Sequence, residues 1–166
     1  MKHFIVLFLS TFLVFNCSED QSSEEEKVNY VWKLTEWSLK ESIDLNNDGE
    51  ATSSFVPGCL NGSRIYFSDS ENASVFISSD VTFYQDHESL DYAMSCSTSS
   101  DRPAVEITYS KNGDEIILNT PDGIFNGYFE GNDLLVEIPE GFEVLDNVTF
   151  ETVLTMDLTL KFSKEE

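Results

Sequence analysis

The chain has 166 residues, of which 40% are hydrophobic and 13% aromatic, and its formal net charge at pH 7 is −22. This length suits one domain with a substantial core, and the aromatic content excludes an acidic disordered chain. The charge, from 31 acidic and 9 basic residues, excludes nucleic acid as an expected partner because it repels phosphate backbones.

The first sixteen residues are typical of a bacterial export signal. Lys2 and His3 precede an apolar run at residues 4–15, which has the length of a signal-peptide core and is short for a bilayer span. The run ends at Asn16 and Cys17, and a cysteine at this place is typical of a lipoprotein signal. We therefore expect residues 1–16 to be cleaved and Cys17 to carry acyl chains that hold the protein at a membrane. The alternative is an ordinary secretory peptide with an incidental cysteine, since Asn16 is larger than the small residue usual at this position.

Residues 17–28 follow as an acidic, flexible tether. They are rich in Ser and Glu, and no apolar residue lies between Cys17 and Lys27. The acidic triplet at residues 18–20 resembles the signal that sends lipoproteins of Bacteroidota-type bacteria to the outer face of the outer membrane. We therefore expect a lipid-anchored outer-membrane protein, exposed at the cell surface, whose single domain spans residues 29–166.

The domain begins with an expected strand at residues 30–39, which leads into an acidic loop at residues 44–50. Oxygen-bearing side chains at alternate positions of this loop, with glycine at the sixth, match the first half of a calcium-binding loop. The candidate calcium ligands are Asp44, Asn46, Asp48 and Glu50. The twelfth position is Phe55, where an EF-hand carries a bidentate Glu, and no flanking helices are predicted. The alternative is therefore an acidic turn without a cation.

Short runs with period-two alternation, separated by turn signals, fill the rest of the chain. Tight turns are predicted at Asn112-Gly113, Asp122-Gly123 and Gly131-Asn132. Further strands are expected at residues 64–68, 73–77, 80–85, 105–110, 115–119, 124–130 and 134–138, and residues 86–94 could hold one helical turn.

The last segment, residues 148–162, shows the alternation best. Its apolar face would carry Val148, Phe150, Leu158 and Phe162, and its other face is almost entirely polar. About nine strands joined by neighbouring hairpins predict an all-β fold. We expect an antiparallel meander that closes into a small β-barrel, with a β-sandwich as the alternative.

The three cysteines allow one internal disulfide. If Cys17 is acylated, Cys59 and Cys96 remain as an even pair in an oxidising compartment, which predicts a bond between them. A metal pair or a catalytic thiol is the alternative, but His87 is the only histidine after Cys17, so a zinc site lacks ligands.

A lipoprotein cysteine, an acidic tether, a Trp-bearing first strand, an Asp/Asn/Gly-rich stretch, a Tyr-Phe strand and a terminal series of hairpins occur together in this chain. The cysteine is Cys17, the tether is residues 17–28, and the first strand carries its tryptophan within residues 31–34. The Asp/Asn/Gly-rich stretch is residues 44–50, the Tyr-Phe strand includes residues 66–67, and the hairpins follow Cys96, with Cys59 between the first strands. Together they resemble the lipocalin-like lipoproteins of Bacteroidota-type bacteria over nearly all of the mature chain. The resemblance implies a small up-and-down barrel and adds almost no chemistry.

No catalytic signature is present: the serines lie in no Gly-x-Ser-x-Gly elbow, and His87 is expected in a solvated loop. We therefore expect no catalytic residues and no enzymatic activity. Aromatic side chains form either core or the lining of a ligand cavity, and the candidates are Trp32, Trp37, Tyr66, Phe67, Phe83, Tyr84, Phe125, Tyr128 and Phe129. We expect a binding module for a small apolar or amphipathic ligand. The alternative is a cell-surface interaction or adhesion protein with a filled core.

The lipid anchor can be tested directly. Cys17→Ser should abolish acylation and leave the unprocessed precursor, because the cysteine is both the site of cleavage and the site of lipid attachment. Labelling of cells with a clickable fatty acid, followed by mass measurement of the protein, checks both outcomes. A substituted protein that is fully processed and retained at the membrane would contradict the anchor.

Overall fold

The computed structural model describes residues 30–98 and 102–165, so the predicted signal peptide, Cys17 and the tether lie outside the described residues. Most of the described residues lie in β-strands. Within these two ranges, no helix is long and apolar enough to cross a membrane.

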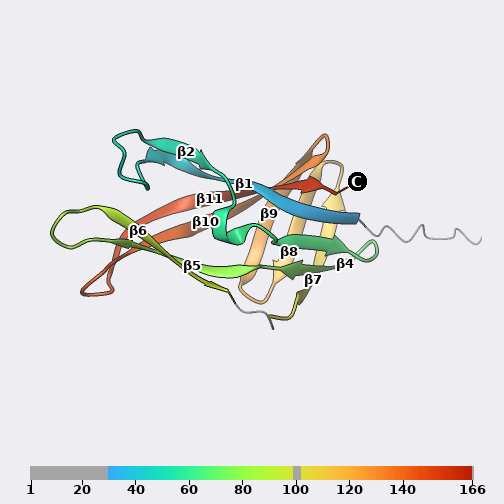
Figure 1. The fold of residues 1–166 in the computed structure, drawn as a ribbon. Coiled ribbons are helices and arrows are strands. Elements are labelled where there is room, and N and C mark those ends of the chain that lie inside the picture. Colours follow the sequence, from blue (N-terminus) through green and yellow to red (C-terminus); the bar gives the residue numbers. More distant parts are fainter. Residues whose placement is uncertain (1–29, 99–101, 166) are drawn as a thin grey trace, which may run out of the picture.

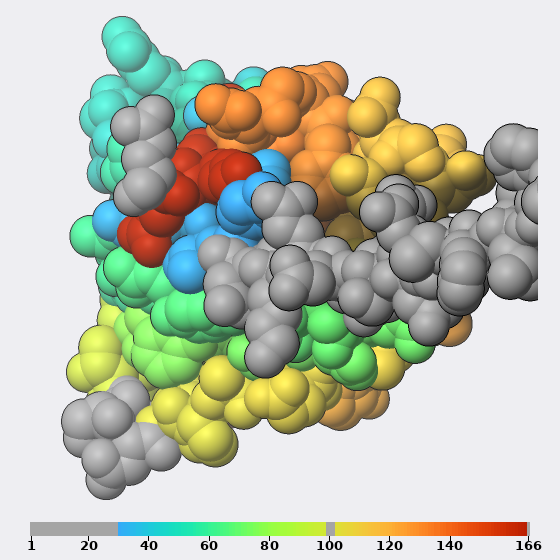
Figure 2. All heavy atoms as spheres, turned by 90° about the vertical axis from the view of Figure 1, so that its right-hand side faces the viewer, coloured from blue at the N-terminus to red at the C-terminus, as the bar shows by residue number. Residues whose placement is uncertain are grey.

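Eight antiparallel strands form a closed β-barrel, as the alternation predicted. The barrel strands are β1 (Tyr30–Ile43), β3 (Arg64–Phe67), β4 (Asn72–Phe76), β7 (Val105–Asn112), β8 (Glu115–Thr120), β9 (Gly123–Glu130), β10 (Asp133–Asp146) and β11 (Thr152–Lys164). They pair in the order β11-β1-β3-β4-β7-β8-β9-β10, and a further pairing of β10 with β11 closes the ring. Figure 2 shows β10 in orange, β11 in red, β1 in blue and β3–β4 in green following one another down one side of the molecule.

Alternate side chains of the barrel strands point inward, because successive residues of a strand face opposite sides of the sheet. Leu34 of β1 lies opposite Phe162 of β11, and each side chain is about 1% exposed. Trp32 packs at 5.3 Å, ring centre to ring centre, against Phe129 of β9, and Ile107 of β7 belongs to the same core. These inward side chains form the core of the barrel.

Strands β1, β10 and β11 continue past the barrel and carry a second, open sheet, the extension (Figure 1). The extension adds β2 (Thr52–Phe55), the 3-10 turn η1 (Gly58–Leu60), β5 (Ser79–Gln85) and β6 (Tyr92–Thr98). Its strand order is β2-β1-β11-β10-β5-β6, and β5 pairs with β10 in parallel. A second core, around Trp37 and Phe142, fills part of it.

A bulge in β10 marks the boundary between barrel and extension. The register of β10 against β11 shifts between Ile138 and Phe142. Glu140 has a φ of +53°, and a Cβ on Gly141 would lie 2.5 Å from the side chain of Ile138. A bulge bends the strand that contains it, so β10 turns here from the barrel wall into the extension.

The predicted closed antiparallel barrel is confirmed, but, apart from the closing pair of β11 with β1, two pairs of neighbouring barrel strands are not consecutive in the sequence: β1 with β3, and β4 with β7. Strand β4 pairs directly with β7, and the β5–β6 hairpin between them in sequence leaves the barrel to join the extension. The single helical turn suggested within residues 86–94 is confined to residues 86–90, where the Leu90 N–H donates to the Asp86 carbonyl oxygen at 3.0 Å; it forms the turn of this hairpin, and Tyr92 begins β6.

The last strand begins later than predicted. Val148 and Phe150 lie in the turn before β11 and are 64% and 65% exposed, so they are not part of its apolar face. Two backbone N–H groups, of Val148 and Thr149, donate to the carboxylate of Asp146, and Phe150 has a φ of +59°. This local turn chemistry outweighs the alternation of the sequence.

Cys59 and Cys96 form the predicted disulfide, with their Cα atoms 6.1 Å apart. The bond joins η1, which follows β2, to β6, the strand at the opposite edge of the extension. It therefore ties together the two edges of the open sheet.

Breaking this bond should lower the free energy of unfolding. The two cysteines are 37 positions apart, and closing a loop of that length restricts the unfolded chain by roughly 4 kcal/mol. Cys59→Ser/Cys96→Ser should therefore unfold at a lower urea concentration than wild type, and reductant should change the wild type alone. Unchanged unfolding in the double variant, or two free thiols in natively purified protein, would contradict the assignment.

Candidate ligand-binding cavities

An apolar cavity of about 510 Å³ opens inside the barrel. Side chains from every barrel strand except β1 contribute to its wall. The apolar wall residues are Ile65, Val75, Ile77, Pro103, Val105, Ile107, Leu118, Pro121, Phe125, Val136, Ile138, Leu160 and Phe162. Beyond them, the barrel is filled by the core around Trp32 and Leu34. The interior is thus packed on one side and hollow on the other, and this hollow is the barrel cavity.

Charged residues lie only at the margin of the barrel cavity. Asp80, near the start of β5, forms an ion pair with Arg102, which precedes β7. The hydrogen bond that the Arg102 guanidinium donates to the Asp80 carboxylate lowers the pKa of Asp80 below its ordinary value. Asp122, in the turn between β8 and β9, is the other charged residue of the lining. The margin therefore carries two carboxylates, one of which is already paired with the single arginine.

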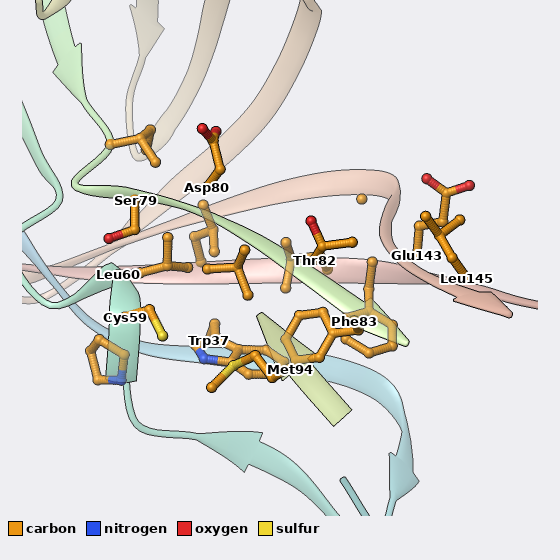
Figure 3. Close-up of a pocket in the computed structure, with 17 residues that line it drawn as sticks. Trp37, Cys59, Leu60, Ser79, Asp80, Thr82, Phe83, Met94, Glu143 and Leu145 are labelled. Atoms are coloured by element: carbon orange, nitrogen blue, oxygen red, sulfur yellow. The ribbon is translucent and has the colours of Figure 1, made fainter. Parts of the chain in front are cut away.

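A second cavity, of about 500 Å³, lies in the extension and is called the extension cavity (Figure 3). Trp37, Phe83 and Met94 lie together along one side of it, and Glu143 and Leu145 lie at one end. Leu158, on the apolar face of the last strand, contacts this cavity and packs against the second core; it lies opposite Ile138, where the β10 bulge begins. Cys59 of the disulfide is part of the same wall.

The aromatic residues divide between core and cavity in a way that the sequence does not indicate. Phe125 lines the barrel cavity, whereas Trp32 and Phe129 pack in the core beside it. Trp37 stacks on Phe55 at a centroid distance of 4.2 Å and also borders the extension cavity. Ser79, Asp80 and Arg102 were not among the predicted site residues, because nothing in their local pattern distinguishes them from other polar residues near a turn.

The predicted calcium loop forms a tight turn held by its own acidic side chains. The carboxylate of Asp44 accepts the N–H groups of Asp48, at 3.1 Å, and Gly49, at 2.7 Å. Asp48 accepts from the Glu50 N–H at 2.8 Å and from the side-chain amide of Asn46 at 2.7 Å. In the described ranges, no group of three or more His, Cys, Asp or Glu side chains is placed to hold a metal ion. Calcium binding by this loop therefore stays a prediction.

His87 lies in the β5–β6 turn and contacts the neighbouring β10–β11 turn. Its Nδ1 atom lies 2.7 Å from a carboxylate oxygen of Asp146, which is buried at the end of β10. The Thr149 N–H, the imidazole of His87 and the Val148 N–H all stabilise the charged carboxylate, so the pKa of Asp146 is lowered far below its ordinary value. The same carboxylate raises the pKa of His87. This arrangement fastens two turns together, and no nucleophile takes part in the described contacts of the pair.

The calcium prediction is tested by calorimetry on wild type and Asp44→Ala/Asp48→Ala. A cation that binds only the folded state should raise the melting temperature of wild type by mass action and leave the variant unchanged. Glu88→Ala, an exposed acidic residue in a different turn, is the control for a general charge effect. If calorimetry detects no heat of binding at millimolar calcium, the prediction is wrong and the loop is a turn without a cation.

The His87–Asp146 pair should make stability depend on pH. Unfolded histidine titrates near about 6.5 and unfolded Asp near about 3.9. The stabilisation from charged His87 is complete below its unfolded pKa and is lost as pH rises through the raised folded pKa. The stabilisation from charged Asp146 is present above its unfolded pKa and is lost as the pH falls through its lowered folded pKa. Urea unfolding should therefore show that the wild type loses stability as the pH rises above about 6.5. His87→Ala should lose less, and an equal loss in both proteins would contradict the contact.

Comparisons of this chain with protein-family models, with curated proteins and with solved structures found no match. The geometry that bears on function is therefore that of a closed eight-stranded barrel with an apolar cavity, joined to an extension with a cavity of its own.

Proposed function

We propose that this chain is a lipid-anchored, lipocalin-like binding protein of the bacterial cell surface, which holds a small apolar or amphipathic ligand in the barrel cavity. The observation that carries the proposal is the hollow side of the barrel, about 510 Å³ in volume with apolar side chains around it. Small-molecule sites in proteins have volumes of roughly 300–1,000 Å³ and mostly apolar walls with a few polar groups. The barrel cavity agrees with both features.

The charges disfavour a ligand with an anionic head. The chain carries a net charge of −22, and the margin of the barrel cavity has two carboxylates. Arg102, the single base of that lining, is neutralised by Asp80. An anionic head would therefore lose its hydration without gaining a free cation in return.

The anchor and the surface location rest on the sequence. Acyl chains on Cys17 would hold the protein at the outer membrane, and the tether of residues 17–28 would separate the barrel from the lipid surface. In such a place the barrel would meet apolar molecules that are poorly soluble in water.

A surface interaction protein is the second candidate function, and the exposed tips of two hairpins favour it. Leu90 in the β5–β6 turn is 61% exposed, and Val148 and Phe150 in the β10–β11 turn are exposed to a similar degree. Because β5 and β10 pair in parallel, these two turns lie side by side. Together they form an exposed apolar surface of the kind found at protein interfaces.

Displacement of a neutral fluorescent probe tests the first function. N-phenyl-1-naphthylamine should brighten on binding to wild type, and membrane lipid extracts should displace it. Val75→Phe places a ring in the barrel cavity and should weaken probe binding about tenfold or more. Ser74→Phe is the matched control, because its side chain lies on the other face of the same strand. Failure of the probe to bind wild type, or equal binding to Val75→Phe, would favour the surface interaction protein.

A further inference from the structure

The extension cavity contains a buried hydroxyl without a partner. Ser79 is 2% exposed and belongs to the lining of this cavity. Among the described residues, its Oγ is the one buried side-chain nitrogen or oxygen that has no hydrogen-bond partner. A buried hydroxyl without a partner costs free energy, so an unsatisfied one at the wall of a cavity calls for an explanation.

The serines around Ser79 show that this is a local feature. Ser63 and Ser78 are within hydrogen-bond distance of each other, with their hydroxyl oxygens 3.3 Å apart. Ser78 also donates to the carbonyl oxygen of Cys59, and Ser63 accepts from the Ser78 N–H. Their hydroxyl groups are therefore satisfied within the protein. Ser79 differs from them in lying at the wall of the extension cavity, beside Leu60 (Figure 3).

The position of Ser79 in the chain places it where the two cavities meet. Ile77 and Asp80, on either side of it in sequence, line both the barrel cavity and the extension cavity, and so does Leu160 of β11. The two cavities therefore adjoin and share part of their lining. The buried hydroxyl lines the extension cavity itself, between two residues of the chain that reach both cavities.

We propose that the extension cavity is part of the binding site, and that the site takes an uncharged lipid ester with two hydrocarbon arms. One arm occupies the barrel cavity and the other occupies the extension cavity beside Trp37, Phe83 and Met94. The ester carbonyl oxygen between the arms accepts the hydrogen bond that Ser79 donates. This inference rests on the proposed function, since it assigns the ligand class to the same barrel cavity.

Three features of the lining support this ligand over others. Two separate apolar volumes of similar size suit two hydrocarbon arms better than one compact ring system. The partnerless group is a hydroxyl, which satisfies one carbonyl acceptor without any charge. Asp80 and Glu143 are the charged residues of the extension cavity, so an anionic ligand would be repelled there as well.

Photoreactive probes test the inference in the full, membrane-anchored protein. The probes are two esters of an eight-carbon acid and an eight-carbon alcohol, with a diazirine at the end of the acid arm in one and of the alcohol arm in the other. Peptide mapping after illumination should find one probe attached to barrel-cavity residues such as Val75 and the other to extension-cavity residues such as Val81. An unlabelled ester should compete with both.

Ser79→Ala isolates the hydrogen bond. It should weaken labelling by both esters roughly three- to tenfold, as expected for one net hydrogen bond, and should not change labelling by a photoreactive alkane of the same length. The variant should fold at least as stably as wild type, because it removes a hydroxyl that had no partner. Val81→Phe, which fills the extension cavity alone, should abolish labelling there and leave a short single-arm probe bound near Val75.

The outcomes separate the inference from the function on which it rests. Labelling confined to the barrel cavity, or equal labelling of wild type and Ser79→Ala by both esters, overturns the two-armed ester and leaves barrel-cavity binding standing. Labelling of neither cavity overturns both.

Discussion

Pairing of β11 with β1 on one side and β10 on the other is the constraint on which the rest of the structure depends. It closes the sheet, so the barrel strands have no unpaired edges. The three strands that make this closure are also the longest, with 13 or 14 residues each. Because they outrun the barrel, one set of strands supports two cores and two cavities.

The place where β10 bends decides how these parts meet. On one side of the bulge, β10 and β11 belong to the barrel wall. On the other side, the same two strands form the central strands of the extension. The β5–β6 hairpin then pairs with the far end of β10, and the disulfide ties β6 to η1. The start of β5 runs beside both cavities, so that Asp80 lines both of them and Ser79 lines the extension cavity.

The barrel strands could be predicted because each has one apolar face and a clear turn signal at its end. Strand β6 was missed because its residues, Tyr92–Thr98, show no such alternation and five of the seven are small or polar. Its pairing with β5, and that of β5 with β10, depends on contacts distant in sequence that no local pattern records. The start of β11 was misplaced because the capping of the turn by Asp146 is stronger than the apolar pattern at Val148 and Phe150.

The candidate site was harder to predict than the fold. Whether an inward apolar residue packs or borders a hollow depends on the combined size of its neighbours from several strands, as Phe125 and Phe129 illustrate. The disulfide followed from cysteine parity, which needs no geometry. Ser79, in contrast, becomes notable only when its burial and its lack of a partner are both known.

Native mass spectrometry of the protein released from its own membrane tests the central claim most directly. Ligand binding in the barrel cavity predicts a species heavier than the acylated polypeptide by the mass of one neutral lipid. That extra mass should be lost on collisional activation and absent from Val75→Phe. A wild-type spectrum with only the acylated polypeptide, under conditions that keep the disulfide and the fold intact, would contradict the account.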